Sequence, residues 1–139
     1  PVQHIDDETG EIALCILSAI NIGKIRDTND LESLCDLSVR SLDELIDFQG
    51  YPVKAAELAT RARRSLGIGY IGLAHYLAKQ GVKYDDPAAW QIVHDLTESF
   101  QYHLLKASNT LAKEEVHVKG LVTLNIQTEF YQLTPIKKR

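Results

Sequence analysis

A short apolar run near the start of the chain, IALCILSAI at residues 12–20, constrains the fold more than any other stretch. It contains almost no polar side chain, and it follows an acidic segment that Gly10 closes with turn chemistry. A strand that is buried on both faces, as in a parallel sheet, has this pattern. We therefore expect a buried strand over residues 12–20, followed by a polar loop.

A helix is expected over residues 29–48. Asn29 and Glu32 have the spacing of a capping box, in which each side chain satisfies a backbone N–H near the helix start. Gly50 and Pro52 both oppose continuation of the helix, so it should end before them. One face is apolar at spacings of three and four residues, at Leu31, Leu34, Cys35, Leu42, Leu45 and Ile46.

Three further helices are expected. Residues 53–65 are polar and rich in alanine, which indicates a short surface helix, and residues 72–81 predict a helix that ends near Gly81. Asp86 and Pro87 then suit the cap and first turn of a long helix. Its expected inner face is a seam of Trp90, Val93, Thr97, Phe100, Leu104, Ala107 and Leu111. Its expected outer face carries His94, Glu98, Gln101 and Lys106.

The end of the chain has a different pattern. Apolar residues fall at six even-numbered positions between 116 and 130, a period-two pattern that indicates strands, with a hairpin turn at Lys119 and Gly120. The expected fold class is therefore α/β, mostly helical, with one or two buried strands and a β-like C-terminal tail.

Gly67, Gly69 and Gly72 have the G-x-G-x-x-G spacing of a dinucleotide-binding loop. Such a loop needs a buried strand before it, and the preceding residues ATRARRS cannot form one. Asp85 and Asp86 lie near the distance expected of the ribose-binding acid, but Asp86 fits better as a helix cap. We therefore disfavour nucleotide binding and expect the glycines to permit close packing.

Charge and composition exclude several classes of function. The net charge of −4 argues against a nucleic-acid binder, and no apolar run approaches the ~20 residues of a membrane span. Two cysteines, with no leader pattern, favour the reducing cytoplasm. The five histidines lack metal-ligand spacing, so no metal site is assigned, although His75 has a position that could face the core. Arg61, Arg63 and Arg64 suggest a solvated basic surface or, alternatively, a contact with another protein segment.

Several motifs together resemble one known family. GEIALCILSAINIG, FQGYPVKAAELATRARRSLGIG, GYIGLAHYLA and YHLLKASNTLAKE follow one another as in the large, catalytic subunit of class I ribonucleotide reductase. The resemblance runs from residue 1 to about 114, which suggests a barrel-domain fragment over 1–114 and a divergent tail over 115–139. Because the tail does not resemble the family's continuation, and the chain opens on Pro1, we expect an internal or split fragment of the subunit.

The resemblance implies a piece of a ten-stranded α/β barrel that reduces ribonucleotides to deoxyribonucleotides by radical chemistry. Cys15 matches one cysteine of the family's redox-active disulfide pair, and Leu17, two residues later on the same strand face, matches a position lining the substrate pocket. The family places no redox cysteine at Cys35, which we expect to pack in the core. From composition alone, a lone cysteine in a buried apolar strand is usually just a small hydrophobe.

The resemblance also implies partners. The fragment itself should bind no cofactor, the radical should come from a metal-containing small subunit, and thioredoxin or glutaredoxin should supply the external dithiol. The remainder of the large subunit, the small subunit and a ribonucleotide are the expected partners, with no nucleic acid and no membrane. The fragment alone should be inactive. The alternative is a non-enzymatic helical interaction module, for which Cys15→Ser would be harmless.

Overall fold

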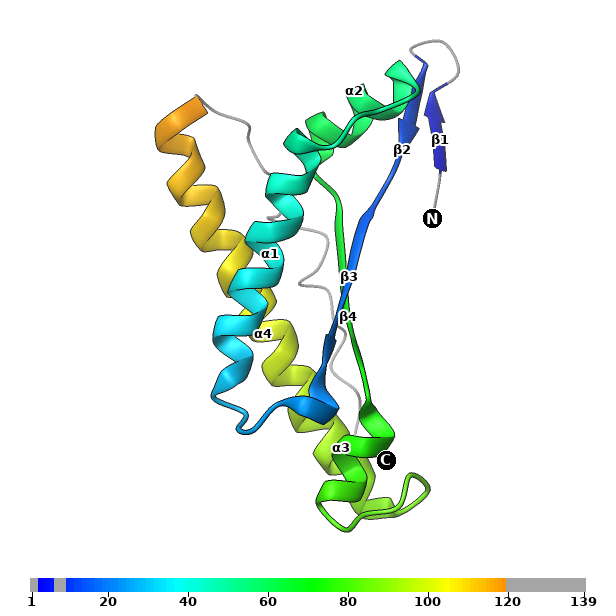
Figure 1. Cartoon of the computed structure of the whole chain (residues 1–139), viewed down its shortest axis with the longest axis vertical. Coiled ribbons are helices and arrows are strands. Elements are labelled where there is room, and N and C mark those ends of the chain that lie inside the picture. Colours follow the sequence, from blue (N-terminus) through cyan, green and yellow to red (C-terminus); the bar gives the residue numbers. More distant parts are fainter. Residues whose placement is uncertain (1–2, 7–9, 120–139) are drawn as a thin grey trace, which may run out of the picture.

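The computed structural model of the chain describes residues 3–6 and 10–119. Helices dominate, and a small parallel sheet lies beside them (Figure 1), so the α/β class is confirmed. The elements in chain order are β1 (Gln3–Asp6), β2 (Glu11–Ala13), β3 (Ile16–Asn21), the 3₁₀ turn η1 (Ile22–Lys24), α1 (Asp30–Phe48), α2 (Lys54–Arg63), β4 (Leu66–Ile71), α3 (Leu73–Lys79) and α4 (Pro87–Lys119).

The apolar run at residues 12–20 forms parts of two strands, not the single strand predicted. Its first residues belong to β2, which pairs antiparallel with β1. Leu14 and Cys15 link β2 to β3, and β3 then pairs in parallel with β4. The register runs from Ile16 beside Leu66 to Asn21 beside Ile71, and the two strands lie side by side along the molecule (Figure 1).

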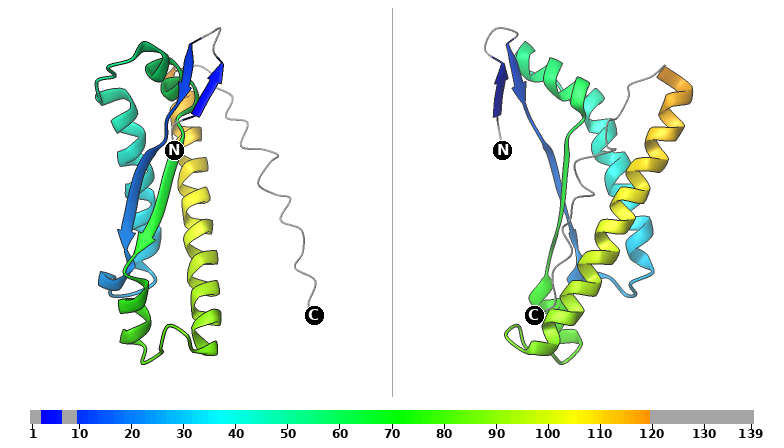
Figure 2. Two further views of the ribbon diagram at one scale, coloured as in Figure 1. Left: turned by 90° about the vertical axis from the view of Figure 1, so that its right-hand side faces the viewer. Right: turned by 180° about the vertical axis from the view of Figure 1, so that it is seen from behind.

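The prediction that this run is buried on both faces is wrong for β3. Its side chains alternate between partly buried and exposed positions, and Leu17 and Ala19 are exposed. Helices α1 and α4 lie against the opposite face, as the left view of Figure 2 shows with both strands in front of the helices. Within the described residues, nothing covers the face that carries Leu17 and Ala19, which we call the open face. The sequence of β3 is apolar on both faces, but the described residues cover only one of them.

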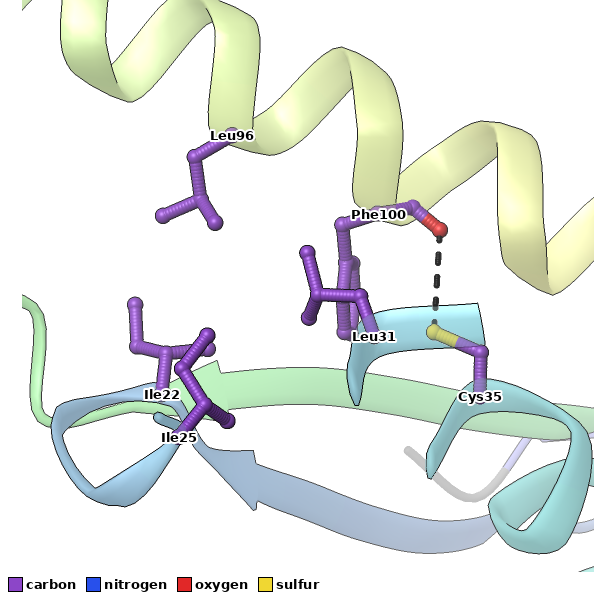
Figure 3. Close-up of a cluster of buried hydrophobic side chains, with 6 residues drawn as sticks. All are labelled: Ile22, Ile25, Leu31, Cys35, Leu96 and Phe100. Atoms are coloured by element: carbon purple, nitrogen blue, oxygen red, sulfur yellow. Dashed lines mark hydrogen bonds between the residues drawn. The ribbon is translucent and has the colours of Figure 1, made fainter. Parts of the chain in front are cut away.

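The main hydrophobic core lies between the sheet and the two long helices. Its buried members are Ile22, Ile25, Leu31, Cys35, Leu96 and Phe100 (Figure 3). Tyr70 of β4 meets the Phe100 ring edge to face, with ring centroids 5.4 Å apart and planes at 89°. Its hydroxyl lies 3.0 Å from Thr97 Oγ1. These contacts attach α4 to the strand that carries the glycine segment.

The start of α1 differs from the predicted capping box. Asn29 already has helical dihedral angles and its side chain makes no cap hydrogen bond. Asp27 satisfies a backbone N–H at the helix start instead, because its carboxylate accepts a hydrogen bond from the Asn29 N–H at 3.0 Å. Glu32, the other expected partner, instead accepts a hydrogen bond from Lys106 of α4 at 2.5 Å. The apolar face of α1 packs as expected except at Leu45, which is exposed.

The long helix α4 begins as predicted, with the Asp86 carboxylate accepting a hydrogen bond from the Ala88 N–H at 2.9 Å and Pro87 as the first helical residue. Trp90, however, is 74% exposed and not part of the inner face. Ala89 is buried in place of Trp90, and Leu96 in place of Thr97, which is also exposed, so the seam is shifted by one residue in this half of the helix. The four residues predicted on the outer face are exposed.

The same helix continues across the predicted boundary between residues 114 and 115. Residues 115–119 form the last part of α4, which ends at Lys119, and not a strand as predicted. The rest of the expected β-like tail, residues 120–139, lies outside the described residues. A divergent tail over 115–139 stays a prediction.

Candidate functional site

Cys15 lies at the junction where the chain passes from β2 into β3. The next residue, Ile16, donates its backbone N–H to the Ser65 carbonyl at 3.1 Å, which joins this junction to the start of β4. The thiol is partly buried and forms no disulfide. The backbone beside Cys15 is thus held against the start of β4, although Cys15 itself precedes β3.

Cys15 and Leu17 both lie against Gly67 of β4. Leu17 is the direct neighbour of Gly67 in the parallel register. A methyl group placed on Gly67 would lie 2.5 Å from Leu17 Cδ2 and 3.2 Å from Cys15 Sγ. The structure therefore brings the two predicted site residues together on one side of β4. Leu17 remains 64% exposed, which leaves it accessible on the open face.

The glycine segment is a strand followed by a helix, and no buried strand precedes it. Helix α2 occupies the residues before β4, as expected. Close packing is confirmed for Gly67 and for Gly72. Gly72 has a φ of 83°, and a methyl group added there would lie 2.6 Å from Asn21 Oδ1 and 3.0 Å from the Gly23 backbone nitrogen. The prediction of close packing is wrong for Gly69, because a methyl group there would meet no atom within 4 Å.

Cys35 is a core residue and not a partner for Cys15. Its side chain has no exposed surface, and its Sγ lies 4.0 Å from the Phe100 carbonyl oxygen (Figure 3). Burial raises the pKa of this thiol to about 11, because the charged thiolate would lose its hydration. An unreactive packing role follows from both observations.

Arg64, placed with a solvated basic surface in the sequence, is largely buried and structural. Its guanidinium donates to the Asp43 carboxylate at 2.6 Å, to the Asp43 carbonyl at 2.8 Å and to Asp47 at 3.0 Å. These hydrogen bonds raise the pKa of Arg64. Arg64 also ends α2 in the left-handed conformation, with φ 47°, directly before Ser65 and β4. The Arg64–Asp43–Asp47 cluster therefore fixes the corner from which β4 starts.

Sequence reasoning missed this cluster because nothing marks Arg64 locally. Glycine is the usual residue at a left-handed helix end, and here an arginine occupies it. The only available signal is the spacing of Asp43 and Asp47, which lie one helical turn apart on α1. The other two arginines of the segment are exposed. Arg61 pairs with Asp47 and Glu57, and Arg63 pairs with Glu11.

The histidines provide no convincing metal site in the described part of the chain. His94, Asp95 and Glu98 have ligand atoms within 4.8 Å of one another on one turn of α4, but all three are exposed. Asp95 already accepts a hydrogen bond from Gln91 at 2.6 Å. His75 is exposed as well, so the prediction that it could face the core is wrong.

An open groove of about 700 Å³ lies between β3 and α1, along the edge of β3 that does not pair with β4. Ser18 on its floor is 2.7 Å from Ser38 of α1, hydroxyl to hydroxyl. Neither Cys15 nor Leu17 lines the groove. The groove therefore adjoins the open face at Ala19 but does not include the two candidate residues.

Comparison with known proteins identifies a family. The family model described as ribonucleotide reductase, barrel domain, matches residues 2–132. The ribonucleoside-diphosphate reductase subunit alpha of Buchnera aphidicola subsp. Schizaphis graminum is 52% identical over 131 residues, which is 94% of this chain and 17% of the relative. The corresponding protein of Haemophilus influenzae is 60% identical over 115 residues, covering 83% of this chain and 15% of its own length.

A phage protein is also similar. The ribonucleoside-diphosphate reductase subunit alpha of Enterobacteria phage T4 is 41% identical over 117 residues, 83% of this chain and 15% of the relative. The chain thus spans about a sixth of the length of the curated relatives that it matches. None of the helices in the described residues combines the length and apolar character needed to cross a bilayer.

Proposed function

The chain belongs to the ribonucleotide reductase barrel-domain family, as its motifs suggested, and on this basis we propose that it forms part of the large subunit of a ribonucleoside-diphosphate reductase. The complete subunit would reduce ribonucleotides to deoxyribonucleotides. The observation that carries the proposal is the placement of Cys15 and Leu17 together beside Gly67, at one end of the open face. In a closed barrel, such a face would point toward the interior.

Cys15 supplies one of the two thiols of a redox pair. A cysteine elsewhere in the large subunit supplies the second, because Cys35 is held in the core. The two thiols lose two hydrogens and form a disulfide, while the ribose 2′ C–O bond breaks and its oxygen leaves as water. The two electrons from the thiols thereby replace the 2′ hydroxyl by hydrogen. Leu17 contributes apolar surface to the pocket that holds the ribonucleotide.

The complete reaction needs groups from other polypeptides or segments. A metal-containing small subunit supplies the radical that starts the reaction, and thioredoxin or glutaredoxin reduces the disulfide afterwards. The described residues hold no cofactor in this scheme, and they bind only the substrate and the remaining parts of the barrel. The reaction would take place in the cytoplasm, where a dithiol reductant is maintained.

Turnover of the complete enzyme tests the proposal. The large subunit that contains this chain is assembled with its small subunit and supplied with a ribonucleoside diphosphate and a dithiol protein. Cys15→Ser is expected to abolish multiple turnover, because serine cannot form the disulfide. Cys35→Ser serves as the matched control and is expected to retain turnover in whatever enzyme folds. Full turnover by the Cys15→Ser enzyme would contradict the proposal and favour the helical interaction module.

A further inference from the structure

Gly67 has no backbone reason to be glycine. The glycines with positive φ in the described residues are Gly10, Gly72 and Gly81, and Gly67 is not among them. It lies inside β4, where glycine is less favourable than alanine because it loses more backbone entropy on folding. The useful property of Gly67 is therefore the space that its missing side chain leaves.

The two candidate site residues border that space on one side. An added methyl group would lie 2.5 Å from Leu17 Cδ2, closer than carbon atoms can approach, and 3.2 Å from Cys15 Sγ, closer than an ordinary contact. We propose that Gly67 is a positioning residue for Cys15, which keeps free the space that the Cys15 sulfur needs when it passes between thiol and disulfide. This inference rests on the proposed redox function of Cys15.

The chemistry explains why the space matters. In the dithiol state the two sulfurs cannot approach closer than van der Waals contact, whereas in the disulfide they are bonded at about 2.05 Å with a dihedral angle of roughly 85–100°. Forming the bond releases two electrons and two protons to the ribonucleotide, and reducing it returns them from the external dithiol. The Cys15 side chain must therefore rotate or shift in every cycle, and a methyl group on Gly67 would restrict that movement.

The two crowded contacts differ in how easily they can be relieved. Leu17 meets the methyl group with the end of a flexible and exposed side chain, so it can rotate away at low cost. Cys15 is short, and its backbone is held through the hydrogen bond from Ile16 to Ser65. Gly67→Ala should therefore fold while leaving the sulfur crowded.

Gly69 provides a matched control. It lies two residues further along β4, so it faces the same side of the sheet, and a methyl group there would meet no atom within 4 Å. Gly69→Ala adds the same methyl group to the same strand with the same change in backbone entropy. A difference between the two variants consequently reports the surroundings of Gly67 alone.

The experiment uses the complete large subunit assembled with its small subunit. Gly67→Ala is expected to lower kcat about tenfold with KM changed less than about twofold, and Gly69→Ala to match the wild type. In redox buffers, Gly67→Ala is expected to shift the equilibrium between the Cys15 thiol and its disulfide about tenfold, equivalent to a change in potential of about 30 mV. A merely structural effect of the methyl group would lower the thermal midpoint without moving this potential.

The outcomes separate the two proposals. If Cys15→Ser leaves turnover intact, the proposed function fails. If Cys15→Ser abolishes turnover but Gly67→Ala matches Gly69→Ala in kcat and potential, the role of Gly67 alone is overturned. If Gly67→Ala does not fold, the double variant Leu17→Ala with Gly67→Ala removes the contact to Leu17 and keeps the one to Cys15. An unchanged potential in that double variant would equally overturn the role of Gly67.

Discussion

The two cysteines of this chain are one residue type in two environments. Cys15 lies at a strand junction beside Gly67, partly accessible, whereas Cys35 is enclosed between α1 and α4. A buried thiol resists ionisation because the thiolate would lose its hydration, and an unreactive thiol cannot take part in disulfide exchange at ordinary rates. These surroundings assign packing to Cys35, and of the two thiols only Cys15 is partly accessible.

The pH dependence of Cys35 alkylation tests this assignment. In the folded protein the pKa of Cys35 is about 11 against an ordinary value of 9.0, so its thiolate fraction should keep rising through pH 9 and 10. In the urea-unfolded chain the same thiol should approach full ionisation above pH 9, and its alkylation rate should level off. Mass spectrometry of the Cys35 peptide after iodoacetamide treatment measures both rates. A rate that levels off over the same pH range in the folded protein as in the unfolded chain would contradict the buried assignment.

At the scale of elements, the corner between α2 and β4 decides where the candidate site sits. Arg64 connects this corner to the C-terminal half of α1 through Asp43 and Asp47. Asp43 is itself buried, so removing its partner would leave a carboxylate without compensation in the interior. The strand that begins at Leu66 then carries Gly67 to its place beside Cys15.

Arg64→Ala is therefore expected to destabilise the corner locally by about 3 kcal/mol. Backbone amides of residues 60–70 in the complete subunit should then exchange with deuterium roughly a hundredfold faster. Arg63→Ala is the matched control, because the neighbouring arginine forms only an exposed pair with Glu11, worth about 0–1 kcal/mol. Equal exchange rates in the two variants would show that the cluster does not hold the corner.

Local sequence signals predicted the helices well where a single residue decides the outcome. Asp86 and Pro87 begin α4 as expected, and the helical pattern of residues 29–48 matches α1 to within one residue. Local sequence signals failed where a residue distant in the sequence determines what a side chain contacts. Glu32 contacts Lys106 on α4 and not the helix start, and Trp90 is exposed because the seam is set by which side of α4 meets α1 and β4.

In the candidate site, too, local signals were predictive and contacts between distant residues were not. The motif around Cys15 pointed to that residue and to Leu17, and the strand period placed both on one face. The closeness of Gly67 to Leu17 and Cys15 was not predictable, since those two residues lie some fifty positions earlier in the chain. Pairing of β3 with β4 depends on the whole fold, and only the structure supplies it.

At the scale of the whole molecule, the sheet is incomplete on its own. Two parallel strands with helices on one face leave the other face, with Leu17, Ala19 and Ile71, exposed within the described residues. Parallel sheets are nearly always covered on both faces. An arc of a barrel has this form, because its inner face is enclosed only when the remaining strands are present.

Hydrogen exchange of β3 and β4 tests this interpretation. In the isolated chain their amides should exchange at least about tenfold faster than in the complete large subunit, where further strands pair with the free edges. Amides of α1 between Cys35 and Ile46 serve as the internal reference, because the helix supplies their hydrogen bonds in both forms. Unchanged rates in β3 and β4 would mean that the strands have no further partners.

The disulfide state of Cys15 after turnover is the most direct measurement of the central claim. The complete enzyme is given a ribonucleoside diphosphate without external reductant, quenched with an alkylating reagent and digested for mass spectrometry. We predict that the peptide with Cys15 is linked through a disulfide to a cysteine outside residues 1–139, and that Cys35 remains a free thiol. Recovery of Cys15 as the alkylated thiol, after deoxyribonucleotide has formed in amounts matching the enzyme, would contradict the account.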